Sequence, residues 1–307
     1  MDAVPDEQTR AWEFVTAPPR CAPGAVSMVG YRALQNPGAI HRGMPSSTLT
    51  FIVSLDEGVQ AAATPEGLHS ARPNPVLLGG LQVQAAHVRQ QRGQAGVQLA
   101  VHPLAARGLF GVPSAELGSI DFDANRLLGR RAAELHERVA EARDWPDAFA
   151  VIADVLRHAW WRRDGARVRP DVARAWQLLV LSRGRLPVGA VSERIGVSSR
   201  HLTTLFRQEV GRSPKTVAML MRFRHATVRI ADSARRRGSV DLAAVAADAG
   251  YSDQAHLTRE FTRFAGAPPR RWLAEEFRNI QDGGHSCGAH CEHDWIESDA
   301  VADAAGP

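Results

Sequence analysis

The pattern of apolar and polar positions changes character near residue 102. Before it, short apolar runs or alternations are bounded by Gly, Pro and Asn, which is typical of strands. These runs predict a small antiparallel sheet or barrel; they occupy residues 26–34, 49–55, 75–84 and 96–101. Residues 1–24 are rich in Pro and polar side chains, and we expect an irregular arm there.

After residue 102 the apolar positions recur at helical spacing. Residues 103–111 and 113–117 predict short helices, and 124–142 and 147–161 predict two longer antiparallel ones. Paired helices of this kind often form a dimer surface, but we interpret their apolar stripes as core. The polar segment 162–170, with Gly and Pro, is a predicted linker.

The clearest feature of the chain is a repeat, in which residues 196–214 and 250–269 carry the same pattern. The matching pairs are Gly196/Gly250 and Ser198/Ser252 at an offset of 54, then Leu202/Leu257, Phe206/Phe261, Gly211/Gly266 and Pro214/Pro269 at an offset of 55. One residue has therefore been added between the turn and the apolar helix of the second copy. A repeated unit of this kind decides the architecture of its region.

Each copy predicts a helix, a tight turn and a second helix. Gly196 and Gly250 suit the left-handed conformation in which a helix ends, and Ser198 and Ser252 are good N-caps for the next helix. Pro214 suits the first turn of a long helix, predicted over 214–236, that joins the two copies. This is a helix-turn-helix arrangement, whose second helix can enter the DNA major groove.

The net charge of the chain is by itself weak evidence for DNA binding, but its basic excess falls on the region that contains the repeat. The chain of 307 residues has a net charge of +4 and an ordinary globular composition. Residues 170–282 hold 18 Arg and one Lys against 11 acidic residues, or +8, whereas 283–307 hold five acidic residues and neither Lys nor Arg, or −5. The basic excess lies where phosphate contacts need it. The run from Arg235 to Arg237 is either a solvated face or a further phosphate contact.

Other classes of protein find little support in the sequence. The chain has no apolar run long enough to cross a membrane and no signal region at its start, and three cysteines give no disulfide framework, so we expect a cytoplasmic protein. It carries no P-loop, nucleophile elbow, zincin motif or paired carboxylates. We therefore predict that it is not an enzyme and holds no cofactor.

The motifs together resemble one family. GVS-x-RHL-x-x-LF in the first copy, GYSDQAHLTREF with G-x-PP-x-x-W in the second, and R-x-x-x-A at Arg222 and Ala226 resemble the AraC/XylS family of bacterial transcription regulators. The resemblance covers about 171–282, and residues 1–165 are more weakly similar to the β-rich sensor domains of such proteins. It implies an α+β chain: a small β-rich sensor or dimerisation domain that ends in helices, then an all-α, homeodomain-like domain with two helix-turn-helix motifs joined by a long helix. Residues 283–307 are then an acidic, disordered tail.

The resemblance also implies partners and site residues. The partners are double-stranded promoter DNA, RNA polymerase, a second copy of the chain and a small-molecule effector in the N-terminal domain. In the family each recognition helix reads its own segment of major groove, and the matching positions here are Arg200, His201, Thr203, Thr204 and Arg207, then Gln254, Ala255, His256 and Arg259. Arg can pair with guanine, and Gln with adenine. Because Arg200 stands where other members have a large aromatic residue, we expect a different half-site sequence; His201 either caps and packs or touches phosphate.

Two alternatives stay open. The tail contains a soft donor set that suits zinc, copper(I) or nickel, formed by His285, Cys287, His290, Cys291 and His293, although it lacks a paired C-x-x-C. A metal- or redox-responsive switch is therefore one alternative. An enzyme-like N-terminal domain that the helical array targets to DNA is the other.

Overall fold

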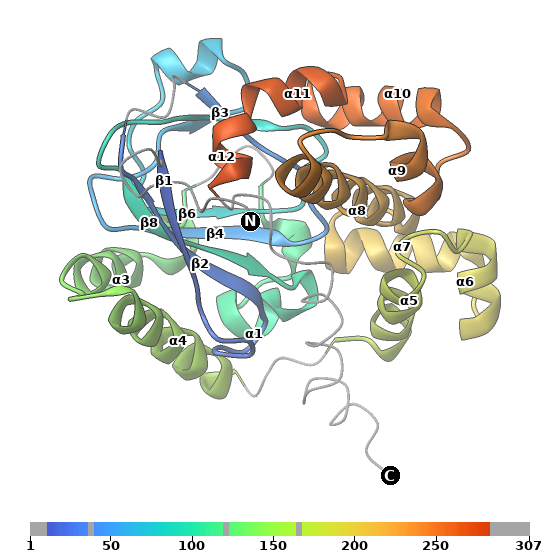
Figure 1. The fold of residues 1–307 in the computed structure, drawn as a ribbon. Coiled ribbons are helices and arrows are strands. Elements are labelled where there is room, and N and C mark those ends of the chain that lie inside the picture. Colours follow the sequence, from blue (N-terminus) through green and yellow to red (C-terminus); the bar gives the residue numbers. More distant parts are fainter. Residues whose placement is uncertain (1–10, 36–39, 119–122, 164–167, 283–307) are drawn as a thin grey trace.

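The computed structural model describes residues 11–35, 40–118, 123–163 and 168–282, and shows a β-rich N-terminal part followed by helices (Figure 1). This confirms the predicted fold class. One antiparallel sheet has the order β1 (Trp12–Thr16), β2 (Ala25–Ala33), β8 (Ala95–Val101), β4 (Leu49–Ser54) and β6 (Val76–Gly79). A second contains β3 (Ile40–Gly43), β7 (Ala86–Arg89) and β5 (Ala61–Ala62).

Side chains alternate between the two faces of the larger sheet, as the period of a strand requires. On β8, Val97 and Val101 are fully buried in a core shared with the following helices, whereas Gln98 between them points to the other face. On β2, Met28 lies in the same core, and Tyr31 belongs to a separate cluster on the opposite face. The sheet therefore has a helix-covered face and an inner face.

The helices after β8 cover that first face. They are α1 (Ala106–Phe110), α2 (Asn125–Leu128), α3 (Arg130–Ala140) and α4 (Trp145–Arg162), with 3-10 turns η3 (Pro103–Ala105) and η4 (Ser114–Glu116). The apolar stripes of α3 and α4 are buried in the core, as we interpreted them, with Leu135 and Ile152 almost fully buried.

Several details of the N-terminal part differ from prediction. The second sheet was not expected, since β3, β5 and β7 all lie outside the predicted runs. Residues 1–24 are not wholly irregular, because β1 pairs with β2 and this long-range pairing leaves no strong local signal. The run 75–84 stops being a strand at Gly79, since Gly80 turns away to bond the carbonyl of Gly118. The helix predicted over 124–142 is broken at Gly129, whose φ of 55° and ψ of −137° lie outside the helical region.

The C-terminal array contains the two predicted helix-turn-helix units (Figure 1). After α5 (Pro170–Leu181), the first unit is α6 (Val188–Ile195) and α7 (Ser199–Val210), and the second is α9 (Leu242–Asp248) and α10 (Gln254–Ala265). The long helix α8 (Pro214–Arg237) joins them, as predicted. The closing helix expected over 269–280 is two short helices, α11 (Pro269–Glu275) and α12 (Phe277–Gln281).

Local capping explains where these helices begin and end. Gly196, Gly211 and Gly266 have left-handed φ values of 83°, 78° and 70° at helix ends, and Ser198 caps α7 by accepting from the His201 amide at 3.1 Å. The prediction that Ser252 caps α10 is wrong. Asp253 does so, accepting from the His256 amide, because the residue added in the second copy lies between Ser252 and the helix.

The two units do not share one core. A continuous buried cluster runs from the β-rich part into the first unit, through Leu109, Trp176 and Phe206. The second unit has its own cluster around Phe223 and Phe261. The domain boundary predicted near 165–171 stays a prediction, and buried contacts cross it.

Candidate nucleic-acid interface and internal cavity

The predicted reading face of α7 is accessible. Arg200, His201, Thr204 and Arg207 are exposed and Thr203 is half-buried. The opposite side of the helix is anchored by buried residues, namely Leu202, Leu205, Phe206 and Val210. The helix can therefore meet DNA without losing its packing.

The two threonines of α7 already use their hydroxyl protons. Thr203 Oγ1 donates to the Ser199 carbonyl at 2.8 Å, and Thr204 Oγ1 donates to the Arg200 carbonyl at 3.2 Å. Each threonine therefore offers DNA a methyl group and an accepting lone pair rather than a donor, unless its side chain rotates.

Of the four predicted residues on α10, three are exposed and one, His256, is not. Gln254, Ala255 and Arg259 are exposed. His256 is half-buried, with Nδ1 placed 3.1 Å from Ser252 Oγ and the ring edge-on to Tyr251 at 5.2 Å between centroids. This histidine is tied to the turn that precedes the helix.

The inner side of α10 is held by a buried polar cluster that the sequence analysis missed. Tyr251 donates its hydroxyl to Glu260 at 2.8 Å, and Arg222 of α8 lies 3.6 Å from the same carboxylate and over the tyrosine ring. Burial, together with the negative charge of Glu260, raises the pKa of Tyr251. The available signal was an acidic residue on the apolar side of α10, three positions after Leu257.

The basic run at the end of α8 has acidic neighbours. Arg235, Arg236 and Arg237 are exposed, but Arg235 lies 3.7 Å from Asp232. Asp241 and Asp248 line one surface hollow together with Arg236 and Arg237. Mixed charge weakens attraction for phosphate. This run is therefore a poorer phosphate site than its sequence indicates.

A cavity of about 270 Å³ lies on the inner face of the larger sheet. Its described lining includes three aromatic residues and four glutamines: Trp12, Phe14 and Tyr31, then Gln82, Gln90, Gln94 and Gln98. The helical array contributes Arg224, Thr227 and Val228 of α8 and Asn279 of α12. The cavity is thus completed only when the β-rich part and these helices are together.

The chemistry of this lining suits a binding pocket. The titratable groups among the described lining residues are Tyr31, His41 and Arg224, with no carboxylate among them. Burial raises the pKa of Tyr31, so its phenol stays protonated. The described lining therefore lacks a pair of carboxylates for general acid–base work.

Within the described residues, no group of three or more His, Cys, Asp or Glu side chains is placed to hold a metal ion. The tail candidates His285, Cys287, His290, Cys291 and His293 lie outside those residues. No described helix has the length and apolarity needed to cross a membrane.

Comparison with known proteins gives one family match. Residues 191–275 match the family described as "Helix-turn-helix domain", which is the AraC-type helix-turn-helix, so the resemblance seen in the sequence is confirmed there. No curated protein matches the chain.

Solved structures of ToxT from Vibrio cholerae are similar over most of the chain. The 1.65 Å structure is 11% identical, with a TM-score of 0.46, and covers 87% of this chain and 99% of its own. A complex with (E)-4-(8-methylnaphthalen-1-yl)but-3-enoic acid has the same values. An unsaturated fatty acid complex is 10% identical, with a TM-score of 0.41 and coverages of 76% and 89%. At these scores the similarity carries no information about ligand or mechanism.

Proposed function

We propose that this protein, which carries an AraC-type helix-turn-helix domain at residues 191–275, is a cytoplasmic transcription regulator that reads two segments of promoter DNA, one with α7 and one with α10. The observation that supports this proposal is the two-sided character of both helices. Each has polar, basic side chains on its exposed face and a buried apolar face that fixes it to the array. A recognition helix needs both properties.

Within this proposal the side chains have different roles. Arg200, Arg207 and Arg259 suit guanine or phosphate, and Gln254 suits adenine. His201 reaches phosphate from its exposed position at the start of α7, whereas the half-buried His256 positions α10 through Ser252.

The proposal is tested by selecting bound sequences from a random DNA library and measuring affinity at moderate salt. Arg259→Ala is expected to cost about 1–3 kcal/mol and to relax the preference at one base position. Arg143→Ala is the control, because Arg143 is an exposed arginine on the β-rich side, paired with Asp147. If the wild-type protein shows no sequence preference, the proposal of a specific reader is wrong; equal weakening of Arg259→Ala on all sequences makes Arg259 a phosphate contact.

We further propose that the cavity binds the effector. A ligand that touches both the β-rich part and α8 or α12 has more contacts when these parts are docked, so its binding favours that arrangement. With no Asp or Glu in the described lining, an amphipathic ligand that is neutral or anionic fits better than a cation. Dimerisation and contact with RNA polymerase stay predictions from the resemblance.

A further inference from the structure

The first helix-turn-helix unit is attached to the β-rich part through a shared core. Its polar contacts, which we call the first attachment, involve Arg107, Ser114, Glu209 and Val210. Arg107 holds the buried Glu209 carboxylate through two bonds of 2.7 and 3.0 Å. The Ser114 hydroxyl lies 3.3 and 3.2 Å from the carbonyls of Glu209 and Val210. Since apolar packing also continues across this contact, the unit and the β-rich part form one packed body.

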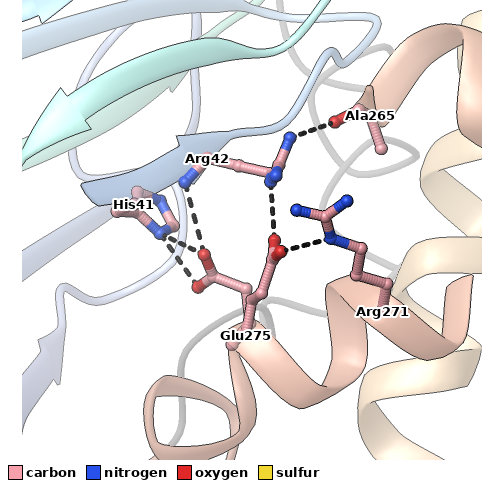
Figure 2. Close-up of polar contacts among 6 residues, drawn as sticks. His41, Arg42, Ala265, Arg271 and Glu275 are labelled. Carbon is pink, nitrogen blue, oxygen red and sulfur yellow. Dashed lines mark hydrogen bonds and ion pairs between the residues drawn. The ribbon is translucent and has the colours of Figure 1, made fainter. Parts of the chain in front are cut away.

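The second unit is attached to the β-rich part mainly through polar contacts. The Ala85 amide donates to the Phe264 carbonyl at 2.8 Å, and the amides of Ala11 and Trp12 donate to Asp282 at 2.9 and 3.0 Å. The largest group of contacts lies between β3 and helices α11 and α12. We call this the second attachment, formed by His41, Arg42, Glu275 and Glu276. Arg42 donates to Glu275 at 2.8 Å and to the carbonyl of Ala265, at the end of α10, at 3.2 Å (Figure 2). His41 Nδ1 lies 2.9 and 3.0 Å from the two carboxylate oxygens of Glu276.

Apolar contact at the second attachment is limited. The second unit has its own buried cluster, and the residues of the β-rich part that pack against it, Met44 and Val83, are only partly buried. Burial lowers the pKa of His41, but the charge of Glu276 and its hydrogen bond outweigh this and raise it, which favours the imidazolium. Most of the specificity of this attachment is therefore electrostatic.

Glu276 connects the second attachment to the cavity. Donors to its carboxylate include His41 Nδ1, the Arg42 amide at 3.3 Å and Asn279 Nδ2 at 2.8 Å. His41 and Asn279 both line the cavity. By contrast, no residue of the first attachment is among the described residues that line it.

Asn279 also indicates which chemical group a ligand in the cavity needs. Its Oδ1 is buried and has no hydrogen-bond partner among the described residues, while its Nδ2 is bound to Glu276. A buried acceptor without a partner is costly, so a ligand donor that bonds it is favoured. Because this oxygen is not itself exposed to the cavity, the bond forms only with a shift of the Asn279 side chain. Such a donor also fixes the amide in the orientation that bonds Glu276.

We infer that a ligand in the cavity, bearing a hydroxyl or N–H group for Asn279, holds the second helix-turn-helix unit in place through Glu276 and leaves the first unit unaffected. This inference rests on the proposal that the cavity is the effector site. Because the first unit shares a core with the β-rich part, the ligand sets the position of α10 relative to α7. Two recognition helices bind one face of DNA together only if their spacing matches the helical repeat of the DNA. The position of α10 relative to α7 therefore controls binding to the full site.

The test is hydrogen–deuterium exchange of the full chain with a neutral fluorescent probe, N-phenyl-1-naphthylamine, whose emission reports binding and whose N–H can donate. Exchange over residues 269–281 is expected to slow about 3–10-fold, the range for one hydrogen bond, with less than about twofold change over 199–210. The N-methylated probe, which lacks the donor, is expected to bind without this slowing.

Two matched variants separate the attachments. In Glu276→Gln, exchange over 269–281 is expected to be faster without probe and insensitive to it. In Glu209→Gln, exchange over 199–210 rises, but the probe still slows 269–281. Equal slowing of both units, or a probe effect retained in Glu276→Gln, would overturn the inference.

The outcomes also distinguish this inference from the proposed function. Probe fluorescence without any change in exchange overturns the role of Glu276 but leaves the cavity as a ligand site. Absence of probe binding overturns both the effector site and the inference. If the wild-type protein shows no sequence preference in the DNA selection, the regulator proposal is refuted, and this outcome has no bearing on the exchange result.

Discussion

The buried cluster behind α10 gives a prediction whose size follows from its geometry. Glu260→Ala removes a carboxylate that is 7% exposed, that accepts from the Tyr251 hydroxyl at 2.8 Å and that lies 3.6 Å from Arg222. Two charges at this separation attract by roughly 4–5 kcal/mol at an effective dielectric constant of 20, before the cost of desolvation is subtracted. The variant leaves Arg222 and Tyr251 without this partner.

The net cost is smaller than that attraction. Breaking a buried ion pair by removing one partner costs about 3–5 kcal/mol, and because Arg222 retains 21% exposure we expect the lower end, about 3 kcal/mol. Tyr251→Phe removes one hydrogen bond and leaves the ion pair, so about 1 kcal/mol is expected. At about 1.4 kcal/mol for each factor of ten, these values correspond to roughly 150-fold and roughly fivefold faster amide exchange.

The assay is hydrogen–deuterium exchange over α10 in the full-length protein, since the second unit has its own core and can open separately. Glu193→Ala is the control, because Glu193 is an exposed acidic residue on α6 of the other unit, and a change within about 0.5 kcal/mol is expected. If Glu260→Ala accelerates exchange over α10 by less than about threefold, the reasoning is refuted. It is also refuted if Tyr251→Phe has as large an effect.

Three further predictions concern other parts of the chain. Burial lowers the pKa of His102 to about 3, so the stability that depends on this imidazole staying neutral is complete above about pH 6.5 and is lost as pH falls towards 3. Because of this group, the free energy of unfolding measured with urea should be about 1.4 kcal/mol lower at pH 5.5 than at pH 7.5. His102→Asn should remove that difference. Gly211→Ala should cost more than Gly196→Ala in thermal unfolding. Both require a left-handed φ, at about 1–2 kcal/mol, but only at Gly211 does the new Cβ meet a backbone atom, 3.0 Å from Ala115 Cα; equal costs would contradict the docking of α7 on η4. Truncation after Asp282 should leave zinc binding in a colorimetric titration unchanged, and the loss of one zinc per chain would instead establish a site in the tail.

The helix-turn-helix region was predictable from sequence to within a few residues. Its signals are local: Gly211 and Gly266 end helices, Pro214 begins the joining helix, and apolar residues recur at helical spacing. Even the error at Ser252 is local, since the added residue moved the cap to Asp253. The exposed positions of Arg200 and Arg259 follow from the same periodicity.

The β-rich part was predictable only as a class. Strand β1 pairs with β2, and the sheet order places β8 between β2 and β4, although β8 comes last among the strands in the chain. Such pairing is decided by which distant segments bury each other's apolar faces. The sequence therefore determined that strands exist there, but not their order or the cavity on their inner face.

The attachments between the parts were decided by tertiary structure alone. His41 and Glu276 are 235 residues apart, and Arg107 and Glu209 are 102 apart. No periodicity or capping rule connects such residues, because local rules act within a few positions along the chain. The sequence by itself determined two helix-turn-helix units and the side chains that they expose. Only the packing of the folded chain decided that one unit shares the core of the β-rich part while the other is attached through charged groups beside a cavity.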